Sequence, residues 1–472
     1  MQKQNPSSWS RREFISAAVA AASAANLPGY GAASRRPDAA GNAPVKIKIK
    51  QTDANFEREP LLRPFGFKGG YMTECWQTTA LLESESGARE IGHCTQNVLW
   101  SDAAVFASHS ESGGNALMFA ITERALQMAK GQSFQTPPEL LDALKDELYE
   151  YSTKITGNPA LRKTFVLNAL VGVDNAAWLL YARENGISNF DDLIPAPYRP
   201  ALAQHHAAVA SIPLMAYAIP ISEIRQAAEE GYFFMKIKIG QPGTQEEMLE
   251  KDKQRMTDIH QAIGGVRTPH TKSGKLPYYF DANGRYEKKE TLLKLLDHAR
   301  KIGAFDQIAI VEEPFPEEYE ANVRDLGVRV AADESAHTDQ DAARRIQMGY
   351  GAMALKAIAK TMSMTMRIAQ LAHEKGVPCF CADLTVNPIL IDWNKNVAAR
   401  LAPFPGLGLG LLETNGHQNY KNWETMVSRH PCAGAPWTRT VKGLFTLDKD
   451  FYDRSGGIFM PSKYYQQMYG KK

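Results

Sequence analysis

Ionisable side chains end a series of short apolar runs in the second half of the sequence, where they could share one site. They are Lys236, Lys238, Asp281, Glu312, Asp333, Lys356, Asp383 and Glu413. A single charge at the end of a strand is common, because strand ends lead into solvated loops. A charge at the end of seven consecutive runs instead favours a shared chemical function.

Three of these residues could hold a metal ion. Asp281, Glu312 and Asp333 end three successive runs, so in a barrel they would converge around one point. Three carboxylates held together repel one another unless a cation lies between them. A set of oxygen ligands without His or Cys favours a hard ion, Mg²⁺ before Mn²⁺, with positions left for water or a substrate carboxylate. The alternative is that each carboxylate pairs with a separate Lys or Arg.

The lysines could move a proton. Lys236 and Lys238 are two residues apart in a predicted strand, so both side chains point to the same face. Two ammonium groups so placed, beside a metal ion, lower each other's pKa, which produces a general base near neutral pH. Lys356, at the end of the sixth run, is expected to face Lys238 across the barrel. Each lysine could instead form a structural ion pair.

Together these groups indicate one reaction. A metal ion that binds both oxygens of a carboxylate, with a base at the adjacent carbon, would stabilise the enediolate formed when the α-proton leaves. Lys238 and Lys356 could then act on opposite faces of the same carbon. The expected partner is a small-molecule carboxylate substrate.

The elements that must position these residues repeat after Pro213. Short apolar runs alternate with helical stretches, which favours βα units and a parallel sheet. The eight runs are 214–219, 233–239, 278–281, 308–312, 328–333, 352–356, 377–381 and 408–413. Eight repeats favour a closed barrel over an open doubly wound sheet, and barrels carry their active sites at the C-terminal strand ends.

The first part of the chain has another pattern. Alternating stretches at 71–83 and 90–98 predict a small antiparallel sheet, and helical spacing follows from Asn115 to about Gly186. We therefore predict three regions after an N-terminal segment of 44 residues. They are an α+β domain at 45–195, the barrel at 196–419 and a C-terminal segment at 420–472 that packs on the first domain.

The N-terminus has the form of a twin-arginine export signal. Arg11 and Arg12 precede a small, apolar run at 16–25 that is shorter than a membrane span. Residues 1–44 are therefore expected to be a signal and linker, and the mature protein to be periplasmic or otherwise extracytoplasmic. The alternative is a chance basic pair before an alanine-rich helix. No other segment is expected to reach transmembrane length.

Composition restricts the remaining partners. Lys and Arg number 54 against 52 Asp and Glu, so no strong positive field exists to hold nucleic acid or an anionic membrane. Five scattered cysteines do not suggest a disulfide framework or a zinc ribbon.

The motifs around the charged residues resemble those of the enolase superfamily, and within it the muconate-lactonising subgroup. In chain order they are Lys236-Ile-Lys238, Asp281-Ala-Asn-Gly284, Glu312-Glu-Pro314, Asp333-Glu-Ser335 and Leu355-Lys356. They resemble the family's Lys-x-Lys, Asp-x-Asn-Gly, Glu-(Gln/Glu)-Pro, Asp-Glu-Ser and sixth-strand lysine. Asp174 and Trp178 lie in a segment similar to the helix that closes the family's capping domain.

This resemblance implies a fold and a mechanism. The fold would be a modified TIM barrel, (β/α)7β, with an α+β capping domain, and relatives are often dimers or octamers. Mg²⁺, or Mn²⁺ as the alternative, would bind Asp281, Glu312 and Asp333. Lys238 and Lys356 would be the acid–base pair, while Lys236 would tune Lys238 and contact the substrate carboxylate.

The reaction implied first is that of a racemase or epimerase acting on a dipeptide or amino-acid derivative. A dehydratase or cycloisomerase of the same subgroup is the nearest alternative. A catalytically silent barrel that binds a ligand is the alternative from another class.

The predicted substrate-binding residues depart from the family pattern. Dipeptide epimerases of the family carry Asp-x-Asp at the eighth strand, whereas this chain has Glu413-Thr-Asn415. Glu413 and Asp383 could still favour a substrate with a positive group, or could cap loops and pair with a nearby cation. Two loops of the first domain, one with Lys68 and one with Trp100, are expected to close over the site.

Overall fold

The computed structural model describes residues 44–67 and 70–470. The predicted signal and linker, except for Pro44, lies outside these residues, as does Lys68. The predicted limits between the three later regions stay predictions, because the chain from Val45 onward clusters as one unit.

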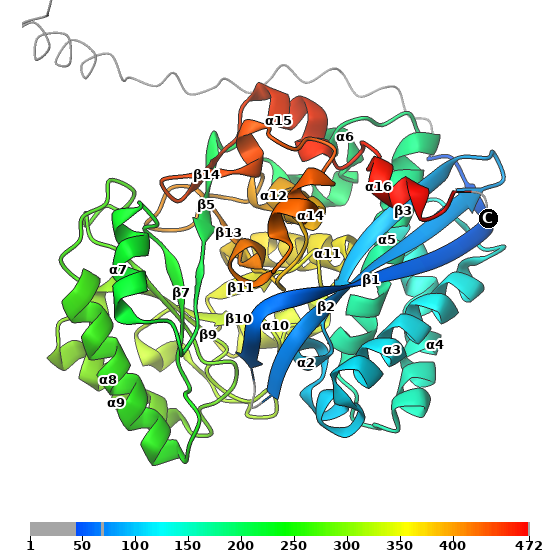
Figure 1. The fold of residues 1–472 in the computed structure, drawn as a ribbon. Coiled ribbons are helices and arrows are strands. Elements are labelled where there is room, and N and C mark those ends of the chain that lie inside the picture. The colour runs from blue at the N-terminus through cyan, green and yellow to red at the C-terminus, as the bar shows by residue number, and fades with distance from the viewer. Residues whose placement is uncertain (1–43, 68–69, 471–472) are drawn as a thin grey trace, which may run out of the picture. The chain divides into compact units, whose positions relative to one another are not determined.

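A curled parallel sheet occupies the second half of the chain (Figure 1). Seven of its strands follow one another in chain order, each bonded to the next. They are β7 (Met235–Lys238), β8 (Tyr278–Asp281), β9 (Ile308–Glu312), β10 (Val330–Ala332), β11 (Ala352–Leu355), β12 (Cys379–Cys381) and β13 (Gly410–Glu413). Each lies within a run predicted from the sequence.

The first strand of the barrel is broken at Pro213. Its first part, β5 (Ala208–Ile212), pairs with β13, and its second part, β6 (Leu214–Met215), pairs with β7. Because the two parts bond to opposite ends of the series, the sheet curls back on itself into a barrel, which confirms the predicted fold class. The predicted first strand at 214–219 contains β6 but missed β5: a proline usually marks a strand boundary, but here it lies between the two parts of the strand, where the pairing partner changes.

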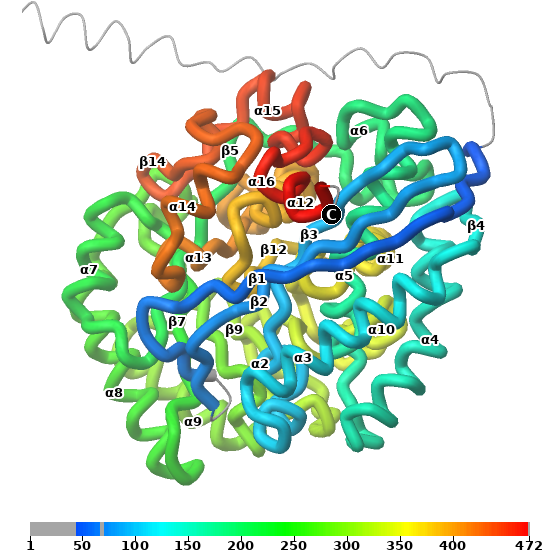
Figure 2. The backbone as a smooth tube through the Cα atoms, turned by 45° about the vertical axis from the view of Figure 1, so that its right-hand side comes forward, coloured from blue at the N-terminus to red at the C-terminus, as the bar shows by residue number. Residues whose placement is uncertain are grey.

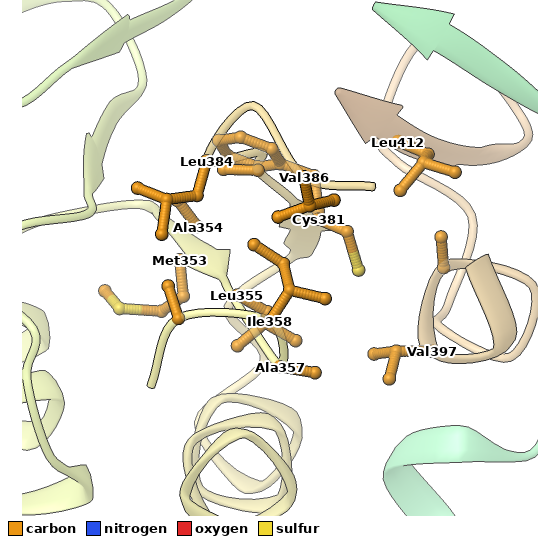
Figure 3. Packing of buried hydrophobic residues seen from close by; sticks show 14 of the residues in the cluster. Met353, Ala354, Leu355, Ala357, Ile358, Cys381, Leu384, Val386, Val397 and Leu412 are labelled. Atoms are coloured by element: carbon orange, nitrogen blue, oxygen red, sulfur yellow. The ribbon is translucent and has the colours of Figure 1, made fainter. Parts of the chain in front are cut away.

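Helices connect the barrel strands on the outside. They are α7 (Ile221–Glu229), α8 (Gln245–Ile263), α9 (Lys289–Lys301), α10 (Asp339–Gln347), α11 (Met362–Glu374) and α12 (Pro388–Ala398). Between β9 and β10 the chain forms only a short 3-10 helix, Arg324–Leu326. Figure 3 shows apolar packing around β11 and β12, where Leu355, Cys381 and Val397 support the strand ends.

The first part of the chain forms an antiparallel sheet covered by helices. The strand order is β3-β2-β1-β4. The strands are β1 (Ile47–Phe67), β2 (Gly70–Ser84), β3 (Arg89–Gln96) and β4 (Ser133–Phe134), and the helices are α2 (Val98–Ser101), α3 (Ala103–Ala129), α4 (Pro137–Thr156) and α5 (Lys163–Glu184). The predicted sheet is therefore present, although the helical region begins earlier than the predicted Asn115.

Helix α5 corrects one expectation. It is long and apolar enough to cross a membrane by length and composition, and its apolar window is entirely buried within the fold. Such burial is typical of a core helix. Its Asp174 accepts hydrogen bonds from the amide (3.0 Å) and hydroxyl (2.5 Å) of Ser363 at the start of α11, and Trp178 Nε1 donates to the same hydroxyl at 3.0 Å. These bonds join the first domain to the barrel.

The C-terminal segment contacts both parts of the fold, and Figure 2 shows its last helix, α16 (Lys463–Gln467), beside β3. Its strand β15 (Leu444–Thr446) extends the barrel sheet antiparallel to β5. The Tyr469 hydroxyl lies 2.7 Å from Thr79 Oγ1 of β2. The five cysteines are free and buried.

Candidate active site

The predicted site residues meet at the C-terminal ends of the barrel strands. Lys238, Asp281, Glu312 and Glu413 are the last residues of β7, β8, β9 and β13. Asp333 and Lys356 follow β10 and β11 directly, and Asp383 follows β12 by two residues. All of these residues, with Lys236, are at most 6% exposed.

The period of a strand brings Lys236 and Lys238 to one side. Their Nζ atoms lie 3.0 and 2.6 Å from the same oxygen, Asp281 Oδ2. Lys236 also reaches Glu312 Oε1 at 2.8 Å and Glu413 Oε2 at 3.2 Å. Burial disfavours the charged form of Lys236, but these three carboxylates outweigh it and raise the pKa of Lys236 well above its usual value. The lowering expected from a lysine pair is therefore not the dominant effect at Lys236.

Lys356 pairs with a different carboxylate. Its Nζ is 2.5 Å from Asp333 Oδ2 and 4.3 Å from the ring centre of Trp100. Burial lowers the pKa of Lys356, whereas the Asp333 carboxylate raises it, and the net shift is upward. The structure thus places one lysine pair at Asp281 and Lys356 at Asp333, so that Lys238 and Lys356 are held by different carboxylates.

A fourth lysine, Lys360, was missed by the sequence analysis. It is fully buried, and its Nζ donates to the Asp333 backbone oxygen at 2.6 Å and lies 3.3 Å from Asp333 Oδ1. Its spacing of four residues from Lys356 in an otherwise apolar segment was the only available signal, and this spacing alone does not distinguish a buried lysine from a solvated one.

The carboxylates that come closest together differ partly from the predicted metal ligands. Oxygen atoms of Glu312, Asp333 and Glu334 all lie within 4.8 Å of one another. Asn283 Nδ2 donates to Glu334 Oε1 at 3.0 Å and to Asp281 Oδ2 at 3.1 Å. Asp281 stays a predicted ligand, and Glu334 is an additional candidate that the sequence analysis did not select.

This cluster fits a hard divalent cation. Burial raises the pKa of Glu312 well above its usual value, and although Lys236 opposes the shift, the carboxylates of Asp281 and Asp333 add to it. A cation at this point would offset that repulsion. Because the clustered donors are all carboxylate oxygens, the set suits Mg²⁺ better than a softer metal.

Strained backbone is concentrated in the loops that carry the site. Seven described non-glycine residues have positive φ, and four of these lie in the loops that follow strands β8, β9, β11 and β12. They are Asn283 (46°), Glu313 (39°), Thr361 (71°) and Thr385 (58°). Each such residue costs about 1–3 kcal/mol, and such strain is typical of functional sites.

A small cavity of about 40 Å³ lies above the cluster. The first domain contributes Phe65, Met72, Asn97 and Trp100 to its wall. The buried Nε1 of Trp100 has no hydrogen-bond partner among the described residues. A carbonyl or carboxylate oxygen of a substrate could accept this hydrogen bond, in keeping with the predicted role of Trp100.

Asp383 and Glu413 also line the cavity, but internal bonds occupy much of both carboxylates. Asp383 accepts from the amides of Asn415 at 2.8 Å and Val386 at 3.4 Å. Glu413 Oε2 accepts from the Asp383 amide at 3.1 Å and pairs with Lys236. The loop-capping and ion-pairing alternatives therefore describe these contacts, and a role in binding the substrate stays a prediction.

Asp383 should make stability depend on pH. Burial and the neighbouring Glu413 raise the pKa of Asp383 from 3.8 to about 7. The folded protein therefore binds this proton more tightly than the unfolded chain, so the free energy of unfolding should fall as pH rises from about 4 to about 7. The slope from one group is at most about 1.4 kcal/mol per pH unit. Urea unfolding of the metal-free wild type and Asp383→Asn at pH 5 and pH 8 measures it, and parallel changes in the two proteins would contradict it.

Comparison with known proteins agrees with this geometry. Residues 221–410 match the family model described as "Enolase C-terminal domain-like". No curated protein matches the chain. The barrel region of this chain is therefore similar to the C-terminal domain of the enolase superfamily.

Solved structures show the same fold. A mandelate racemase/muconate lactonizing protein from Herpetosiphon aurantiacus is similar at 16% identity and TM-score 0.60, over 85% of this chain and 96% of that one. The dipeptide epimerase from Cytophaga hutchinsonii, complexed with Mg and D-Ala-L-Val, is similar at 17% identity and TM-score 0.57, over 78% of this chain and 87% of that one. The N-succinyl Arg/Lys racemase from Bacillus cereus is similar at 14% identity and TM-score 0.57, over 79% of this chain and 89% of that one. These neighbours show that the chain shares their fold.

Proposed function

We propose that this protein is a Mg²⁺-dependent racemase or epimerase that removes and returns the proton α to a carboxylate. The observation that carries the proposal is that Lys238 and Lys356 pair with two different buried carboxylates, Asp281 and Asp333, beside the candidate metal ligands. Two bases so arranged can each reach one face of the same carbon, as a 1,1-proton transfer requires.

Glu312, Asp333 and Glu334, with Asp281 beside them, would hold the ion. Bound Mg²⁺ supplies positive charge next to the substrate carboxylate, which stabilises the charge that develops when the α-proton leaves. Lys238 in its neutral form accepts the proton from one face, and the ammonium of Lys356 donates a proton to the other. The roles exchange for the opposite enantiomer. Lys236, held by Asp281, Glu312 and Glu413, keeps a positive charge beside the carboxylate of the substrate.

The substrate we propose is a dipeptide or an N-substituted amino acid. Two of the structural neighbours act on such molecules by their names, a dipeptide epimerase and an N-succinyl Arg/Lys racemase. The open hydrogen bond of Trp100 suits an amide carbonyl, which both kinds of substrate contain.

Proton NMR in D₂O tests this function. The mature protein with Mg²⁺ is incubated with small pools of dipeptides, N-acylamino acids, proline betaines and hydroxy acids. Loss of an α-proton signal together with inversion at that carbon is the expected result. Loss of water or ring closure would instead identify a dehydratase or cycloisomerase. Ligand binding without any exchange would overturn the proposal in favour of a silent binding barrel.

We also propose that the chain is exported by the twin-arginine route, on the basis of Arg11, Arg12 and the apolar run at 16–25. Changing Arg11 and Arg12 together to lysine should retain the protein in the cytoplasm. The matched control changes Arg35 and Arg36 to lysine, a second basic pair that follows the apolar run. Cell fractionation and immunoblotting measure the distribution, and equal export of the two variants would exclude this route.

A further inference from the structure

Tyr279 is a buried barrel residue whose hydroxyl contacts Glu312, one of the candidate metal ligands. It is two residues before Asp281 on β8, so both side chains lie on the inner face of the strand. Its exposure is 0%, and it lies opposite Lys236 in the register of β7 and β8. Its ring packs 5.6 Å from that of Phe234 and 5.5 Å from that of Phe380, centre to centre.

The hydroxyl completes the hydrogen bonds of one candidate ligand. Tyr279 donates to Glu312 Oε2, and Lys236 donates to Glu312 Oε1 at 2.8 Å. The Lys236 Nζ also lies 5.3 Å from the centre of the Tyr279 ring. Each oxygen of Glu312 therefore has one donor, and the two donors together fix the plane of the carboxylate.

The two donors differ in charge, and this difference matters for a cation. The ammonium of Lys236 repels a nearby metal ion, whereas the neutral hydroxyl of Tyr279 orients the carboxylate without adding positive charge. Groups that hydrogen-bond to metal-ligating carboxylates orient them, and their loss typically weakens metal binding 10- to 100-fold. A phenylalanine would fill the same space between Phe234 and Phe380, so packing alone does not require the hydroxyl.

We propose that Tyr279 is a positioning residue that holds Glu312 in the orientation needed to bind Mg²⁺. This inference rests on the proposed function for the presence of the metal ion. It extends that function by assigning part of the metal affinity to a residue outside the metal-binding motifs.

The test compares Tyr279→Phe with Tyr278→Phe. Tyr278 is the adjacent residue of β8, but its hydroxyl lies 2.9 Å from His260 Nδ1 of α8, on the outer side of the barrel. Isothermal titration calorimetry with MgCl₂, without substrate, gives the dissociation constant of each protein. Tyr279→Phe should bind Mg²⁺ about 10- to 100-fold more weakly than wild type, and Tyr278→Phe should bind it equally well.

A double substitution shows whether Tyr279 acts through Glu312. If it does, adding Tyr279→Phe to Glu312→Asp should weaken Mg²⁺ binding by much less than it does in wild type.

Unchanged or tighter binding by Tyr279→Phe, with wild-type circular dichroism, overturns this inference and leaves the proposed function intact. Failure of wild type to bind Mg²⁺ at millimolar concentration overturns both. If Tyr279→Phe does not fold, Tyr279→Leu, which also lacks the hydroxyl, replaces it and should bind Mg²⁺ more weakly than wild type. Wild-type affinity in that variant overturns the inference.

Discussion

Alanine at Lys238 or Lys356 is expected to reduce the rate of racemisation by about 10²- to 10⁴-fold, the usual contribution of a general acid or base. Each substitution removes the amine on one side of the carboxylate cluster, where Lys238 contacts Asp281 and Lys356 contacts Asp333. Racemisation needs both amines, because one accepts the proton and the other returns it on the opposite face. Proton NMR in D₂O, starting from each pure enantiomer, measures both exchange and inversion.

The two variants should also differ from each other. With one base left, exchange without inversion should survive for the enantiomer whose proton faces that base, and opposite enantiomers should survive in the two variants. Lys375→Ala is the matched control, because Lys375 is an exposed lysine at the end of α11. Full racemisation by both variants would remove the lysines from the mechanism.

Removing the metal ion should have a comparably large effect. EDTA should reduce exchange to the background, and added Mg²⁺ should restore it, because the carboxylates of Glu312, Asp333 and Glu334 are otherwise left to repel one another. Asp333→Asn should lower both Mg²⁺ affinity and exchange by at least about 10²-fold. Calorimetry and NMR measure the two quantities on the same sample.

The control for this prediction is Asp297→Asn, since Asp297 is an exposed carboxylate on α9 that pairs with Arg300. It changes the net charge as Asp333→Asn does but lies on a surface helix. An enzyme that remains fully active in EDTA would contradict a role for the metal ion.

Much of the fold was predictable because its signals are local. A strand of a parallel barrel is a short apolar run, and β7 to β13 each lie inside such a run. The first strand was placed wrongly because Pro213 is an ordinary boundary signal, and only the pairing of β5 with β13 and of β6 with β7 shows that the strand continues through it.

The site was predictable in part. The residues at strand ends were found because the period of a strand and the order of the strands fix which side chains converge. Tyr279, Glu334 and Lys360 were missed, because each acts through a contact with Glu312, Asp333 or Asn283 that depends on the depth of the barrel and the path of a loop. Their residue types alone fit a core tyrosine or a surface charge equally well.

The sequence by itself determined the inventory and order of the chemical groups: two lysines on one face of a strand, carboxylates at three successive strand ends and a lysine across the barrel. Periodicity carries this information, because it depends only on neighbours in the chain. The tertiary structure alone decided which of these charged groups pair with one another. It placed Lys236 among Asp281, Glu312 and Glu413 and tied Asp383 to loop amides. Such distances depend on strained loops, including Thr361 at φ 71°, whose conformation the surrounding packing imposes.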